Sequence, residues 1–168
     1  MQNNSHVSGG LMDEKITQEQ AVTQQLRIIF KAVQAHSKTV EKVCGLSSAQ
    51  LWMLYEVSEA PGVKVSQLAK TLVIHPSTCS NMLDKLEAKE LISRDRSKTD
   101  QRSVHLFMTD MGKVLLKNAP VPPQGKLSEA LERLSVEQIK KLQCGLEDLI
   151  TGLNVKDDNQ GLTPIPIE

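Results

Sequence analysis

The chain has 168 residues with 20 basic and 20 acidic side chains, so its formal net charge at neutral pH is zero. Hydrophobic residues make up 39% and charged residues 24%, which is ordinary for one globular domain with a helical arm and argues against wholesale disorder. No window approaches the roughly 20 consecutive apolar residues of a membrane span, and the polar start lacks a signal-peptide core, so we expect a cytoplasmic protein.

Three further classes of function are disfavoured. The cysteines, Cys44, Cys79 and Cys144, are widely spaced and form no CxxC pair, which argues against a disulfide framework and a cysteine-based zinc site. The sequence contains no GxSxG, no phosphate-binding glycine loop and no HExxH, so we expect neither an enzyme nor a cofactor. An aromatic content of 2% leaves few platforms on which single-stranded RNA could stack.

The N-terminal quarter predicts one long helix. We expect residues 1–16 to be a flexible tail and the helix to begin at Thr17. Gly45 should end this helix, and Ser47 should cap a second one over residues 49–60. Apolar residues at helical spacing predict a buried stripe in which His36 takes one position; the others are Val22, Leu26, Ile29, Val33, Val40 and Val43.

The next segment has the pattern of a helix-turn-helix. Ser66 is placed to cap a short third helix over residues 67–72. Pro76 suits the first turn of a fourth helix that runs to Ala88, where Ser77 and Thr78 could accept hydrogen bonds from free N–H groups. Two short helices joined by a tight turn are typical of a helix-turn-helix.

The pattern changes to strands after the fourth helix. ELISR and SVHLFMT, at residues 90–94 and 103–109, read as two antiparallel strands around a charged hairpin. A helix from Asp110 to Lys117 should follow and end at NAPVPPQG, because prolines cannot continue a helix. A last helix is expected from about Leu127 to Leu153, before a tail at residues 156–168 that is extended or disordered.

These elements define the expected architecture. The fold class is mainly α with a small β hairpin, in which a winged helix-turn-helix over residues 46–117 is flanked by long helical regions at 17–45 and 118–155. Residues 62–103 carry a net charge of +3, while residues 1–61 carry −1 and residues 104–168 carry −2. A basic centre between acidic ends is the pattern expected if the centre meets phosphate.

Three stretches of residues 46–116 follow one another in an informative order: LSSAQLWMLYEV, VSQLAKTLVIHPSTCSNMLDKLEAKELISR, and DQR followed by VHLFMTDMG. This ordered set resembles the MarR family of bacterial transcription regulators, above all because the last stretch matches the family's D-x-R wing motif with its strand, threonine and glycine. The resemblance covers about seventy residues. It implies a homodimer, held together by the flanking helices, that binds a pseudo-palindromic double-stranded operator. Two departures stand out: Glu90 lies where glycine is usual, and neither Asn81 nor Met82 is the basic residue common there.

The resemblance also assigns residues to DNA. The fourth helix has an apolar side at Cys79, Met82, Leu83 and Leu86, and its opposite side is polar. The helix would enter the major groove and the wing the adjacent minor groove or its phosphates. The implied contacts are Ser66, Pro76, Ser77, Thr78, Asn81, Lys85, Arg94, Lys98, Asp100 and Arg102. An ordinary solvated helix and hairpin are the plainer alternatives.

Members of this family usually repress and are released by a small ligand or by thiol oxidation. His36 is our first candidate for an aromatic or phenolic effector, with Trp52 and Tyr55 as possible neighbours, although core side chains are the commoner interpretation of all three. Cys44 is the redox candidate, although a small buried thiol is again the commoner case. A winged helix used only for protein contacts remains the other alternative.

Overall fold

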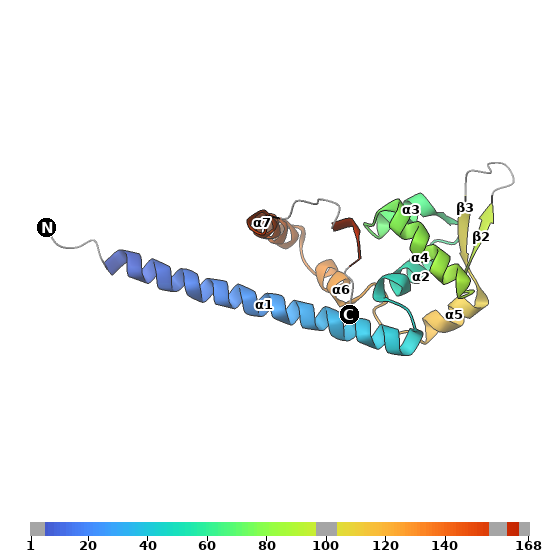
Figure 1. Cartoon of the computed structure of the whole chain (residues 1–168), viewed down its shortest axis with the longest axis horizontal. Coiled ribbons are helices and arrows are strands. Elements are labelled where there is room, and N and C mark those ends of the chain that lie inside the picture. Colours follow the sequence, from blue (N-terminus) through green and yellow to red (C-terminus); the bar gives the residue numbers. More distant parts are fainter. Residues whose placement is uncertain (1–5, 97–103, 155–160, 165–168) are drawn as a thin grey trace.

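The computed structural model describes residues 6–96, 104–154 and 161–164, and only the backbone of 6–11 and Arg96. A long helix runs along one side of a winged helix-turn-helix, and its N-terminal half extends well beyond the other elements (Figure 1). In the described residues the elements are α1 His6–Cys44, α2 Ser48–Glu59, β1 Val63–Lys64, α3 Val65–Thr71, α4 Pro76–Ala88, β2 Ile92–Arg96, β3 Val104–Met108, α5 Asp110–Lys117, α6 Lys126–Glu132 and α7 Val136–Gly152. Within those ranges, no helix is both long and apolar enough to cross a membrane.

Helix α1 begins earlier than predicted. It already starts at His6, so the structure differs from the flexible tail that we expected over residues 6–16. No proline interrupts this stretch, and the Thr17 hydroxyl donates to the Asp13 carbonyl one turn back. The helix ends as predicted before Gly45, whose φ of +63° is a conformation that glycine adopts without strain.

The core lies under the helix-turn-helix. Ser47 caps α2 as predicted: its side chain accepts from the Gln50 N–H, and the Gln50 side chain accepts from the Ser47 N–H. The buried residues of α2 pack against those of α3, α4 and the sheet; the cluster includes Leu46, Met53, Leu54, Val57, Leu68, Cys79, Leu83, Leu86, Leu91, Ile92 and Leu106. The sequence stripe of α4 therefore faces the core as expected.

The sheet has one strand more than predicted. Strands β2 and β3 form the expected antiparallel hairpin, in which Arg94 pairs with Leu106, and β1 adds a third strand on the other edge of β3. Strand β1 contains only Val63 and Lys64, which is too short for an alternating pattern to reveal.

The caps of both helices in the helix-turn-helix differ from the prediction. Helix α3 begins at Val65, so Ser66 lies inside its first turn and does not cap it. Pro76 is the first residue of α4 as expected, but the cap is His75, whose Nδ1 accepts from the Ser77 N–H at 3.3 Å. Ser77 and Thr78 therefore do not provide the cap that the sequence suggested.

The C-terminal part is also more divided than predicted. The helix expected over residues 127–153 is broken after Glu132, because Ser135 caps a new helix, α7, together with Gln138. Residues 161–164 are not simply an extended tail. They begin with a short 3₁₀ turn, and the Leu162 carbonyl accepts from the His75 N–H at 3.1 Å.

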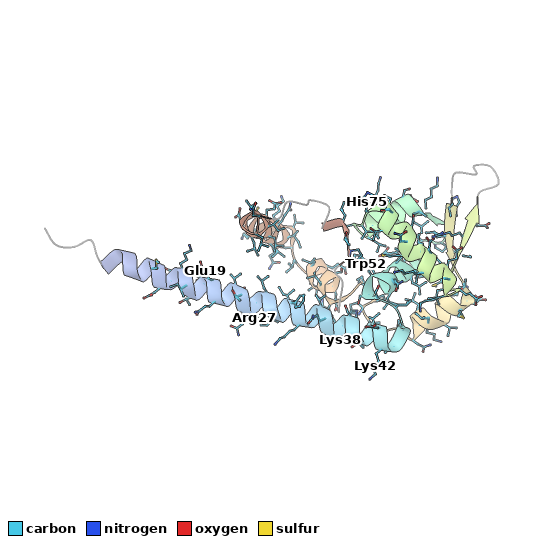
Figure 2. The ribbon with its side chains drawn as sticks, in the orientation of Figure 1. Glu19, Arg27, Lys38, Lys42, Trp52 and His75 are labelled. Atoms are coloured by element: carbon cyan, nitrogen blue, oxygen red, sulfur yellow. The ribbon has the colours of Figure 1, made fainter. Side chains whose placement is uncertain are left out.

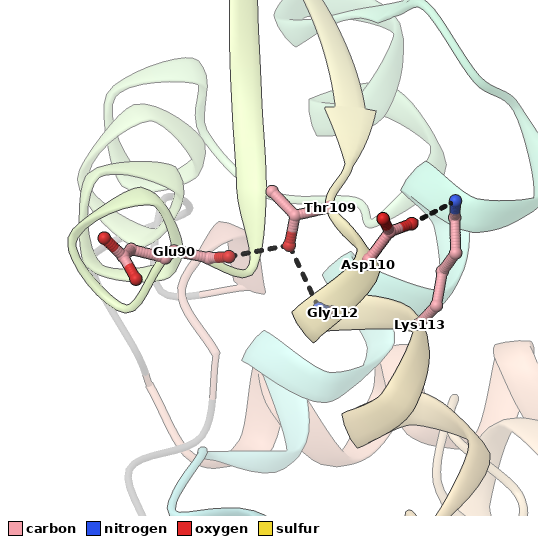
Figure 3. A network of polar contacts seen from close by, with 5 residues as sticks. All are labelled: Glu90, Thr109, Asp110, Gly112 and Lys113. Carbon is pink, nitrogen blue, oxygen red and sulfur yellow. Dashed lines mark hydrogen bonds and ion pairs between the residues drawn. The ribbon is translucent and has the colours of Figure 1, made fainter.

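Helix α4 ends in a tight junction with β2 and α5. The Leu91 N–H donates to the Leu86 carbonyl and the Glu90 N–H to the Glu87 carbonyl, which is the Schellman pattern. Glu90 therefore has a φ of +57°. The Thr109 hydroxyl donates to the Glu90 carbonyl at 2.6 Å and accepts from the Gly112 N–H at 3.0 Å (Figure 3).

We predict that Glu90→Gly stabilises the protein by about 1 kcal/mol, because a side chain at positive φ is strained and glycine is not. The midpoint of thermal unfolding should rise by about 2 to 4 °C. Glu90→Ala is the matched control: it removes the carboxylate but keeps the strain, so its midpoint should stay near that of the wild type. An equal gain in both variants would show that the carboxylate, and not the backbone, is responsible.

Candidate nucleic-acid interface

Helix α4 presents one exposed polar face. Pro76, Ser77, Asn81 and Lys85 are exposed and Thr78 is half-buried, while Cys79, Leu83 and Leu86 on the other side are fully buried. Ser66 is exposed on the neighbouring α3. The structure thus places these six predicted contact residues at solvent-accessible positions on the two helices, where short polar side chains can reach a partner.

His75 is a site residue that the sequence analysis missed. Its ring lies before the first turn of α4, with Nδ1 2.7 Å from the Ser77 hydroxyl oxygen. Nδ1 also accepts a hydrogen bond from the Ser77 N–H, so the ring fixes the position of the Ser77 side chain at the start of the exposed face. The signal was present in the sequence, since the residue before a proline in the first turn occupies the cap position.

Arg94 does not lie where the resemblance suggested. Its guanidinium is 2.7 Å from the Asp84 carboxylate and 3.4 Å from the Glu87 carboxylate, and it donates to the Ser80 carbonyl at 3.3 Å. The side chain is 26% exposed, and its Nε is buried without a hydrogen-bond partner among the described residues. Arg94 thus binds β2 of the wing to α4 instead of extending toward solvent.

The other wing residues cannot be placed in the same way. Lys98, Asp100 and Arg102 lie outside the described residues, so the predicted pairing of Asp100 with Arg102 stays a prediction. The two strands that flank this stretch are paired up to its edges, because Arg96 pairs with Val104.

Of the three effector candidates, only Trp52 lines either of two hollows that the described residues form beside α4. His36 is 9% exposed on α1 and lies beside Gly125 at the start of α6. Its Nε2 is buried with no partner in the described part of the chain, and burial, aided by Lys126, lowers its pKa and favours a neutral ring. Trp52 donates to Glu56 and borders a hollow of about 240 Å³ between α2 and α4; neither His36 nor Tyr55 lines it.

A second hollow lies where α1, α2 and α4 meet. It measures about 740 Å³ and opens between the C-terminal end of α1, the start of α2 and one flank of α4. Thr78, Met82 and Lys85 line the α4 side, and Ser37 and Glu41 line the α1 side. This hollow therefore borders two of the residues that we expected at DNA.

Comparison with known proteins finds similarity to DNA-binding regulators over the same elements. The model of the MarR family matches residues 46–104, which contain α2, the helix-turn-helix, β2 and the first residue of β3. The HTH-type transcriptional repressor MdtR of Bacillus subtilis is 27% identical over 114 residues, which cover 68% of this chain and 74% of that protein. Residues 46–104 of the chain therefore carry the pattern of the MarR family.

Solved structures of MarR-family regulators share the fold. FabT from Streptococcus pneumoniae, crystallised in complex with DNA, is 26% identical with a TM-score of 0.53, covering 81% of this chain and 97% of that one. The transcriptional regulator BldR from Sulfolobus solfataricus is 27% identical with a TM-score of 0.51, covering 83% and 96%. The chain is therefore similar to transcription regulators.

The three cysteines differ in accessibility. Cys79 is fully buried on the core side of α4, and burial raises the pKa of its thiol to about 11. Cys44 is half-buried at the end of α1, and burial raises its pKa as well. Cys144 is exposed on α7. A raised pKa keeps a thiol protonated, so Cys44 has neither the exposure nor the thiolate character of a reactive cysteine.

We predict that iodoacetamide at pH 8 alkylates Cys144 first. A thiol with a pKa of about 11 is deprotonated in about one molecule in a thousand at that pH, and Cys79 is also shielded by the core. Peptide mass spectrometry of native protein should show Cys79 reacting at least about a hundredfold more slowly, with Cys44 between them. Cys144→Ser should remove the fast phase; a fast phase that persists at Cys44 would restore it as a redox candidate.

Proposed function

We propose that this protein is a homodimeric MarR-family repressor that binds double-stranded DNA with α4 in the major groove. The observation that carries the proposal is the exposed polar face of α4. The opposite face of this helix is apolar and buried in the core. Short hydroxyl and amide side chains with one lysine suit base edges and phosphates. The net charge of +3 over residues 62–103 has the sign that a phosphate backbone attracts.

The proposed contacts fall into two groups. On the helices they are Ser66, Pro76, Ser77, Thr78, Asn81 and Lys85, and on the wing they are Lys98, Asp100 and Arg102. We no longer propose Arg94 as a DNA contact, because its ion pairs with α4 give it the role of positioning β2 against that helix. The crystal structure of FabT with DNA supports the proposal, since that relative is similar along most of this chain.

A dimer would bury two apolar stripes that one chain leaves exposed. Of the stripe predicted on α1, only His36 and Val40 are buried, while Val22, Leu26 and Ile29 are 41–46% exposed. Helix α7 carries a similar set, Leu142, Leu146, Leu149, Ile150 and Leu153. Two-fold pairing is the commonest way to cover such surfaces, and it would present the two α4 helices about 34 to 36 Å apart.

Release by a small aromatic or phenolic ligand is the regulation that we favour. A ligand that binds more tightly to a dimer geometry unable to span both half-sites shifts molecules into that geometry. DNA binding then weakens by an amount set by the difference between the ligand's affinities for the two geometries. His36 remains the candidate contact, because its buried Nε2 lacks a partner among the described residues. Thiol sensing by Cys44 is less favoured, since burial raises the pKa of that thiol.

The test of DNA binding is a selection from random duplexes followed by titration against salt. We expect Lys85→Ala to weaken the binding of every duplex and to lower the slope of log K against log salt by about 1, because one phosphate contact is lost. Lys38→Ala is the matched control: this lysine is exposed on α1, away from α4 (Figure 2), and its removal should leave the slope unchanged.

Failure to enrich any duplex at any salt concentration would remove the proposed function. A winged helix that serves protein contacts alone would then be the better explanation.

The dimer is tested by introducing one charge into the exposed stripe of α1. Leu26→Glu should convert the dimer to a monomer in sedimentation at micromolar concentration, because a buried unpaired carboxylate is costly. Gln25→Glu adds the same charge at the next position, which is off the stripe, and should leave the mass unchanged. Monomers for all three proteins, wild type included, would show that these stripes have another partner.

A further inference from the structure

The start of α4 is in contact with the C-terminal end of the chain. The His75 N–H, which precedes the first turn of α4, donates to the Leu162 carbonyl at 3.1 Å. Residues 161–164 lie beside the helix-turn-helix and not beside α7, the helix that precedes them in the sequence (Figure 1). This contact joins a part of the chain outside the family match to the helix that we propose reads DNA.

The segment also borders a mainly apolar hollow between α2 and α4. Gly161, Thr163 and Pro164 border the smaller hollow together with Trp52 and Met82. Pro164 reaches the rim of the larger hollow as well, whose α4 side includes Thr78 and Lys85. Figure 2 shows Trp52 and His75 in this part of the molecule. The segment therefore borders the flank of α4 that carries two proposed DNA contacts.

The chemistry of the contact resembles that of a phosphate at the same place. N–H groups at the start of a helix bind phosphate oxygens, and a peptide carbonyl offers them an oxygen acceptor of the same kind. The Leu162 carbonyl takes one such donor at the end of α4 that should enter the groove. A duplex that approaches this end must meet residues 161–164.

We propose that residues 161–164 compete with duplex DNA for the start of α4 and so weaken its binding until they are displaced. The inference rests on the proposed function and adds a regulation to it. The contact is suited to exchange, because it depends on one backbone hydrogen bond and on side chains that are only partly buried. The apparent affinity for DNA is then reduced by the fraction of molecules in which the segment is undocked.

The test compares three proteins with one selected duplex at one salt concentration. They are the full chain, a chain that ends at Gln160, and a full-length variant with Leu162→Gly, Thr163→Ser and Pro164→Gly. The second and third proteins should bind about three- to tenfold more tightly than the first. A synthetic peptide of residues 161–168 should return the truncated protein to the affinity of the full chain.

The triple variant separates competition from charge. Truncation removes Glu168, so a general electrostatic gain would appear in the truncated chain alone, and that result would overturn the inference. Equal affinities for all three proteins would also overturn it while the proposed function stands. Binding of no duplex by any of them would instead remove the proposed function, and the competition with it.

A measurement without DNA tests the contact itself. Exchange of the His75 amide hydrogen with solvent, followed by NMR, should be slow in the full chain and faster in both altered proteins. The truncated chain lacks the carbonyl of residue 162, and in the triple variant that carbonyl is no longer held at the His75 N–H by docked side chains. The amide of Cys79, which donates to the His75 carbonyl inside α4, is the internal control and should exchange equally in all three. Unchanged exchange at His75 would overturn the inference.

Discussion

The position of α4 depends on backbone hydrogen bonds at its C-terminal end. Thr109 binds both residues that leave the helix: its hydroxyl donates to the Glu90 carbonyl and its N–H to the Leu91 carbonyl. The same hydroxyl caps α5 by accepting from Gly112. A Cβ atom at residue 112 would collide with the Leu91 carbonyl, so only glycine allows α5 to approach this closely. The threonine and glycine after β3 are therefore a structural requirement.

This junction makes α4 and the wing a single unit. Leu91 and Ile92 are buried directly after the turn, and Arg94, two residues further along β2, reaches back to Asp84 and Glu87. A strand that begins at the end of α4 and is also paired to its side cannot move independently of it. The two parts proposed to meet adjacent grooves thus keep a fixed relative orientation, which is a form of preorganisation for binding.

The sequence predicted what depends on local patterns. The apolar side of α4, Gly45 and Ser47 could each be assigned from spacing or from one residue's conformational preference. The details that depend on distant residues were not predictable. Arg94 appeared to be one of several equivalent charges until the fold placed Asp84 beside it, and a two-residue strand such as β1 exists only because β3 is there to pair with. The sequence suggested an extended or disordered tail, yet the Leu162 carbonyl accepts from the His75 N–H, which is far away in the sequence.

The two ends of α4 are therefore held in different ways. At its C-terminal end the helix is fixed by a Schellman turn, a capping threonine and buried leucines, which form with the core and cannot be released without unfolding part of it. At its N-terminal end Cys79 is buried in the core, but before the first turn the described contacts to α4 are those of the His75 ring and of one carbonyl from a distant segment. In the proposed function this end of α4 enters the major groove, so the group that contacts the start of α4 can be exchanged while the core stays intact. A regulator built in this way can adjust its affinity for DNA at the start of the helix without a cost in stability at the other end.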